Sequence, residues 1–291
     1  MEDKYIVDQT PYEVGVDTDG TLTTFKPIQD IVFSIILEID RICRKNNIPY
    51  ALAFGSTLGL YNYQGFIPWD DDADIAIDYF DIPRLIEAFK NDLSEEFEFV
   101  CYETNPSFNT FWPTFKVKKK TGYMQDKNHK RMPDRTNTYE GFFVDIVAFM
   151  GMKNRFVHFM HIFKRQIQIP FYYLVDSLFN HDPKGMKRSM KKIEAKLANK
   201  HKDAKYVCQS VILPFQNPNV NLYPRDVIYP FKEYTFNGVK LYSFNDIKEF
   251  CRIRYGERSL KYWDGEKYID RLNKKYRVAL HIKKFHIDKE K

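Results

Sequence analysis

Apolar residues recur along this chain with two different periods, and the change of period predicts alternating helices and strands. Between Pro27 and Lys45 they return every three or four residues, the repeat of a helix with one buried face. Residues 50–54 and 72–78 are short apolar or alternating runs, as strands are. The expected core face of the helix consists of Ile28, Ile31, Val32, Ile35, Ile36, Ile39 and Ile42.

The same patterns place the remaining elements and predict an α+β fold. Further helices are expected over 56–62, 83–93 and 244–255, and further strands over 97–103, 110–119 and 141–149. Helices dominate 155–203, and the tail 271–291 favours helix. We expect a mixed sheet flanked by helices with a mostly helical C-terminal portion. Residues 1–150 would form the catalytic core, and 151–291 would complete the same domain or form a subdomain.

Composition excludes several other classes of protein. The 291 residues carry a net charge of +6 and are 16% aromatic, which fits a globular chain with a large core. The four cysteines are widely separated without a C-x-x-C motif, so we expect buried, reduced thiols rather than a zinc site or disulfides. Neither a signal peptide nor a run of about 18 apolar residues is present, and we therefore expect a cytoplasmic protein.

Four carboxylates crowd into residues 70–74, namely Asp70, Asp71, Asp72 and Asp74. In a strand that starts at Asp72, the side chains of Asp72 and Asp74 share a face. Such a pair suits Mg²⁺ or Mn²⁺, and Asp70 would join it if the chain stays extended. Asp71 is expected to point away, as a solvated group or one behind the ligands.

The cluster has two simpler interpretations. A run of aspartates is often just a solvated loop. A calcium-binding EF-hand loop is excluded, because Ile75 stands where the loop needs glycine and Ile82 where it needs glutamate.

A small-residue turn precedes the acidic cluster. Gly55, Ser56 and Thr57 follow an apolar strand and open a predicted helix. The backbone N–H groups of such a turn can bind an anion, and the hydroxyls add donors. A phosphate-binding turn followed by a metal-binding strand is what phosphoryl or nucleotidyl transfer requires.

The segment 47–77, NIPYALAFGSTLGLYNYQGFIPWDDDADIAI, closely resembles the LicD family. The matching residues are Gly55, Ser56, Thr57, Leu58, Gly59, Gly65, Phe66, Ile67, Pro68, Trp69, Asp70, Asp71, Asp72 and Asp74. The resemblance implies a nucleotidyltransferase-like fold. It also implies transfer of phosphocholine or a phospho-alditol from a CDP-activated donor to a hydroxyl of a cell-surface glycan, such as lipopolysaccharide, teichoic acid or capsule.

Other segments resemble the same family. Residues 114–122 look like its basic strand and turn, which include Lys116, and 141–146 look like a strand that supplies a third carboxylate, Asp145. A hydrogen-bonded core aspartate is the other interpretation of Asp145. Residues 229–236 and 254–256 resemble the closing region of the family more weakly.

The resemblance and the local chemistry together predict a set of site residues. Metal ligands would be Asp70, Asp72 and Asp74; catalytic residues would be Asp72, Asp74 and Asp145; substrate-binding residues would be Gly55, Ser56, Thr57 and Lys116. The polar loop 122–138 is expected to be a flap, from which His129, Lys130, Arg131 and Arg135 contact the donor or are merely solvated.

Charge is concentrated in the second half of the chain. Residues 151–205 contain 13 Lys or Arg against 4 Asp or Glu. The basic region 184–202 is either a surface that meets the inner face of a membrane or an anionic glycan, or a solvated helix face. Residues 157–179 form either an amphipathic helix lying on a bilayer or, as we expect, a partly buried core helix. No nucleic-acid-binding motif is present, so no nucleic-acid partner is expected.

Two alternative functions remain open at this point. A nucleotidyltransferase that places NMP on a small molecule shares the Gly-Ser turn and the Asp-x-Asp strand, although residues 66–69 argue against it. A binding module without catalysis has no need for the intact carboxylates.

Overall fold

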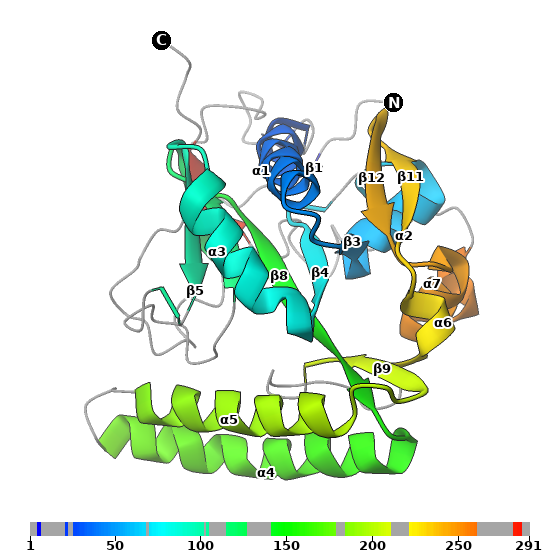
Figure 1. Cartoon of the computed structure of the whole chain (residues 1–291). Helices are drawn as coiled ribbons and strands as arrows, with labels where there is room; N and C mark the ends of the chain where they lie inside the picture. The colour runs from blue at the N-terminus through cyan, green and yellow to red at the C-terminus, as the bar shows by residue number, and fades with distance from the viewer. Residues whose placement is uncertain are drawn as a thin grey trace.

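A computed structural model describes residues 5–6, 21–22, 26–67, 70–101, 103–104, 115–126, 141–178, 184–210, 221–260 and 282–286. Its centre is a nine-stranded mixed sheet (Figure 1). The strands are β3 (Tyr50–Ala53), β4 (Asp74–Asp78), β5 (Phe97–Cys101), β6 (Phe115–Lys119), β8 (Phe143–Met152), β9 (Tyr206–Gln209), β10 (Leu222–Pro224), β11 (Lys232–Phe236) and β12 (Val239–Ser243).

The long strand β8 organises this sheet. One edge pairs in parallel with β4, while the other edge pairs first with β6 and then with β9, both antiparallel. The main order is β10-β9-β8-β4-β3-β12-β11, and β5 is attached through β6. Strands β9 to β12 all follow residue 150, so the C-terminal part of the chain contributes to the same sheet.

Helices connect and cover the strands. They are α1 (Lys26–Lys45), α2 (Phe54–Tyr63), α3 (Ile82–Asp92), α4 (Arg155–Leu178), α5 (Lys184–Lys200), α6 (Arg225–Ile228) and α7 (Ile247–Tyr255). Short 3-10 turns cover Tyr79–Asp81 and Glu257–Leu260. Two strand pairs lie outside the main sheet, β1 (Tyr5–Ile6) with β2 (Thr21–Leu22) and β7 (Tyr123–Asp126) with β13 (Ile282–His286).

The sheet is buried on both faces because its strands alternate between two cores. Leu52, Ile75 and Ile77 pack with the isoleucines of α1 and with α3. Ala51 and Ala76 point to the opposite face and pack with residues of α6 and α7. Small residues on that second face let large aromatic rings approach the sheet, where Phe149, Phe244 and Phe250 form one contiguous cluster.

Most expected elements are confirmed. The structure is an α+β fold with a mixed sheet flanked by helices, and the isoleucines on the core face of α1 are buried, except Ile31, which is partly buried. All four cysteines are buried and free, as expected. Burial raises the pKa of the Cys43 and Cys251 thiols to about 12.

Three expectations about local structure are wrong. The strand expected from residue 72 begins at Asp74, so Asp70 to Ala73 form an irregular approach to it. The expected flap begins as strand β7, and part of the tail expected to be helical is its partner β13. Pairing between these strands overrides local helix propensity, as is common for short segments. The rest of the expected flap, 127–138, lies outside the described residues.

Helix α4 runs along the lower edge of the molecule in Figure 1, with α5 returning in the opposite direction. His158 and Ile162 are buried, so the helix is partly buried as expected. Its opposite side is apolar and exposed, as the alternative interpretation of an amphipathic helix requires. Among the residues that the structure describes, we find no helix whose length and hydropathy would allow it to span a bilayer.

Candidate active site

Three charged side chains meet where β4, β8 and β6 lie side by side. Asp74 on β4 is the register partner of Asp145 on β8, and Asp145 is in turn opposite Lys116 on β6. The backbone N–H of Asp145 also donates to the carbonyl of Ala73 at 3.1 Å, which fixes the start of the pairing. The expectation that Asp145 lies on a strand next to the acidic segment is therefore confirmed.

Strand periodicity places these three side chains on one face of the sheet. Ile75, Ile146 and Val117 belong to the core beneath α1, so the residues that precede them on each strand point to the opposite face. The polar group thus lies at the edge of the aromatic core formed with α7. Sheet register brings together residues separated by up to 71 positions in the chain.

Lys116 and Asp145 form an ion pair. The Lys116 Nζ lies 3.3 Å from Asp145 Oδ1, with the lysine side chain 11% exposed and the aspartate 33%. The same ammonium lies 3.3 Å from the centroid of the Phe143 ring, a cation–π contact that limits its movement. An anionic ligand at Lys116 would therefore lie directly beside Asp145.

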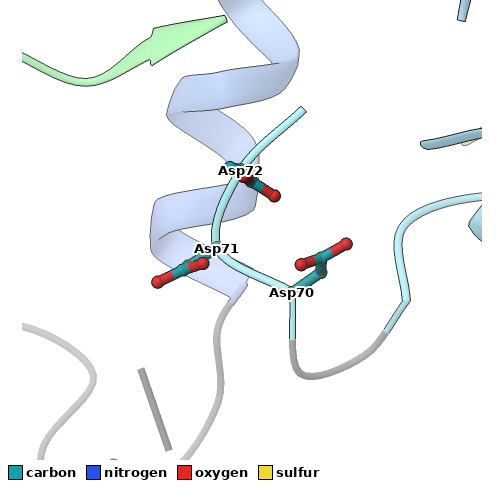
Figure 2. A group of neighbouring side chains, drawn as sticks. All are labelled: Asp70, Asp71 and Asp72. Carbon is teal, nitrogen blue, oxygen red and sulfur yellow. The ribbon is translucent and has the colours of Figure 1, made fainter. Parts of the chain in front are cut away.

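The other carboxylates lie on the irregular segment before β4. Asp70, Asp71 and Asp72 each offer an oxygen within 4.8 Å of the others. Figure 2 shows the carboxylates of Asp70 and Asp72 on one side of the backbone and that of Asp71 on the other. Asp71 points away as expected, and because it is buried, it agrees with the second of the two expected positions, behind the ligands. In the described chain Asp74 is not a member of this group.

Helices α1 and α2 hold this acidic segment in place. The Gln29 amide of α1 donates to the carbonyls of Ile67 and Asp70, both at 3.0 Å. A Cβ at Gly55 would lie 3.0 Å from Asp70 Oδ2, and one at Gly59 would lie 2.4 Å from the carbonyl oxygen of Gly65. Two glycines of α2 therefore permit the close approach of the segment that carries the carboxylates.

The two hydroxyls of the Gly-Ser-Thr turn have different tasks. The Ser56 Oγ accepts a hydrogen bond from the backbone N–H of Asp74 at 3.1 Å and so ties α2 to the start of β4. This contact uses the oxygen of the hydroxyl and not its hydrogen. The Thr57 hydroxyl is fully buried and donates to the carbonyl of Leu52 at 2.7 Å, so it stabilises the turn from inside the protein.

The acidic segment fits a small divalent cation. Two oxygens bound to one Mg²⁺ at about 2.1 Å can be at most about 4.2 Å apart. The observed limit of 4.8 Å between Asp70, Asp71 and Asp72 is within a small side-chain adjustment of that value. Carboxylate oxygens are also the ligands that Mg²⁺ and Mn²⁺ prefer.

The end of α7 supplies residues that sequence reasoning did not place in the site. Enclosure raises the pKa of the Tyr255 hydroxyl, an effect that Arg254 opposes and the negative charge of Asp74 reinforces. Overall, 40% of Tyr255 is exposed, although its hydroxyl is enclosed and senses the charge of Asp74. The Arg254 guanidinium lies 4.8 Å from the centroid of the Phe54 ring. The only signal in the sequence was the weak resemblance over 254–256.

Four expected donor contacts cannot be placed. His129, Lys130, Arg131 and Arg135 lie outside the described residues.

The mixed sheet and its helices define an α+β domain. At one end of the sheet, a turn that contains glycine lies beside clustered carboxylates, which makes this a candidate site for phosphate and metal. Residues 47–178 match the family model for the LicD/FKTN/FKRP nucleotidyltransferase domain, a little under half of the chain. The resemblance to the LicD family is confirmed over these residues, which include Asp70 to Asp74, Lys116 and Asp145.

One curated relative is the lipopolysaccharide cholinephosphotransferase LicD of Haemophilus influenzae. It is 27% identical over 74 residues, which cover 25% of this chain and 28% of the relative. The chain thus aligns with about a quarter of that protein's length.

Proposed function

We propose that this protein is a metal-dependent transferase. It would move phosphocholine or a related phospho-alditol from a CDP-activated donor to a hydroxyl of a cell-surface glycan. The observation that carries the proposal is the meeting of the acidic segment, the Gly55 turn and the Asp74–Asp145–Lys116 group at one end of the sheet. The family match and the name of the curated relative support the transferred group and the acceptor class.

The acidic side of the site would bind the donor's diphosphate through Mg²⁺ or Mn²⁺. Asp70 and Asp72 face the same side of the segment, and Asp74 follows at the start of β4. These residues would hold the ion, and Asp71 would support them from behind. When bound, the ion would offset the negative charge of the diphosphate.

The remaining residues would position the two substrates. The backbone at Gly55 and the hydroxyl of Ser56 would bind phosphate oxygens, and Lys116 would pair with them from the opposite side. Asp145 lies beside Lys116, where it would either complete the metal site or accept the proton of the acceptor hydroxyl.

The test is release of CMP from a panel of donors. Purified protein would be incubated with CDP-choline, CDP-ribitol, CDP-glycerol or CDP-ethanolamine, with Mg²⁺, Mn²⁺ or EDTA, and with ATP and CTP as controls. We expect metal-dependent CMP release from one CDP donor. The double variant Asp72→Asn, Asp74→Asn should lose at least about 100-fold in rate, a loss typical of removing electrostatic stabilisation.

Asp203→Asn is the matched control, because Asp203 is exposed in the turn between α5 and β9. It should keep full activity. Pyrophosphate released from ATP or CTP would instead identify a nucleotidyltransferase. If calorimetry detected no binding of metal or nucleotide, a non-catalytic binding module would replace the proposal.

A further inference from the structure

Large apolar side chains form an exposed stripe along α4. They are Phe156, Phe159, Met160, Phe163, Ile167, Phe171 and Leu174, and their exposed fractions run from 44% to 71%. At roughly 100° per residue these seven positions fall within an arc of about 120°. Scattered apolar residues on a surface need no explanation, but a continuous stripe of this kind marks a binding surface.

The borders of the stripe are polar and basic. Lys164 and Gln166 are exposed on α4 and flank the apolar arc on its two sides, and Arg155 is exposed at the start of the helix. The next helix, α5, carries exposed basic residues at every fourth position: Arg188, Lys192, Lys196 and Lys200. An apolar face with basic borders is typical of a helix that lies in the interface of a bilayer.

We propose that α4 docks the protein onto a membrane surface rich in anionic lipid. The phenylalanine side chains would enter the boundary between headgroups and acyl chains, while the basic residues of α4 and α5 would pair with lipid phosphates. This inference does not depend on which group the protein transfers.

Charge argues for lipid over a second copy of the chain. Two α4 faces packed about a two-fold axis would bring the basic borders of both copies together, and like charges repel. Residues 151–205 contain 13 basic and 4 acidic residues. This positive charge disfavours pairing of two copies and favours attraction to anionic lipid.

The test is co-sedimentation of the full chain with phosphatidylcholine vesicles that either contain or lack phosphatidylglycerol. We expect binding to the anionic vesicles that weakens as salt is raised. The triple variant Phe163→Gln, Ile167→Gln, Phe171→Gln should bind at least about tenfold more weakly. Leu37→Gln is the matched control, because Leu37 is 36% exposed on α1, outside the stripe, and should bind like the wild type.

Circular dichroism and thermal unfolding would establish that the triple variant folds, which is expected because the three side chains are exposed. Equal binding of the triple variant and the wild type would overturn the proposal. The proposal would also be overturned if the wild-type protein did not bind anionic vesicles, or if it bound neutral vesicles as strongly as anionic ones. A wild-type dimer that becomes monomeric in the variant, measured by light scattering, would assign the surface to a second copy instead. The donor turnover assay uses soluble substrates and no vesicles. A negative result in the vesicle experiment would therefore leave the proposed transfer reaction to be tested separately.

Discussion

Helices α1 and α4 have the same kind of apolar repeat but opposite surroundings. The isoleucines of α1 are buried between the helix and the sheet, with Ile39 and Ile42 at 0% exposure. The apolar stripe of α4 faces outward, with Phe156 71% exposed. A helical repeat of apolar residues thus predicts a helix with one apolar face, without identifying what lies against that face.

The largest change in stability is expected from a comparison of two isoleucines, one from each helix. Ile39→Ala should lower the free energy of unfolding by about 3 kcal/mol, because it leaves a cavity in the core. Ile167→Ala should change it by less than about 0.5 kcal/mol, because that side chain is 61% exposed. Denaturant unfolding without lipid measures both values. Similar losses in the two variants would show that α4 packs against the protein through its stripe.

The next effect tests the polar contacts that join α1 to the connection after α3. Glu38 accepts hydrogen bonds from Arg41 and from the backbone and hydroxyl of Ser94. These contacts, with Arg41 foremost, lower the pKa of Glu38 from 4.5 to about 2 despite the cost of burial. Because the folded-state pKa is lowered, this stabilisation is complete above about pH 4.5 and is lost as pH falls through about 2.

Glu38→Gln should therefore cost about 2 kcal/mol at neutral pH, after allowance for the half-exposed Arg41. The difference from the wild type should shrink between about pH 4.5 and 2. Unfolding titrations across that range measure it, with Glu98→Gln, exposed on β5, as the control. A difference that stays constant with pH would contradict the assigned cause.

The smallest expected effect compares two neighbours in α2. Thr57→Val removes a buried hydroxyl that bonds to Leu52 and should cost about 1 kcal/mol in stability with little change in donor KM. Ser56→Ala should weaken donor binding and also loosen Asp74, so it should affect CMP release more than stability. Denaturant unfolding and donor titrations of both variants measure how each substitution affects stability and donor binding. The opposite pattern would place Thr57 in the site.

The sheet and the acidic segment could be predicted because their signals are local. The isoleucine repeat of α1, the alternation of Ile75 and Ile77, and the run that contains Asp145 each indicate an element by themselves. That Asp145 lies next to Asp74 was available only through the family resemblance, because parallel pairing across 71 residues leaves no local pattern.

Other features depend on tertiary contacts that no short pattern encodes. Burial of Asp71 and of the Thr57 hydroxyl follows from how α1 and α2 close over the segment, through contacts such as that of Gln29 with Asp70. The β7–β13 pair joins residues more than 150 positions apart, so the helix propensity of the tail was misleading. The expected roles of the site residues stay predictions until activity is measured.

The pairing of β12 with β3 has a consequence for synthesis of the protein. Ser243 donates to the carbonyl of Leu52 at 3.0 Å, although the two residues are 191 positions apart. At about 5–20 residues per second, a ribosome needs roughly 10 to 40 s to make the intervening chain. During that interval β3 lacks its parallel neighbour, and an open strand edge can pair with other chains. The nascent protein therefore has a period of exposure to aggregation that ends only when β12 emerges.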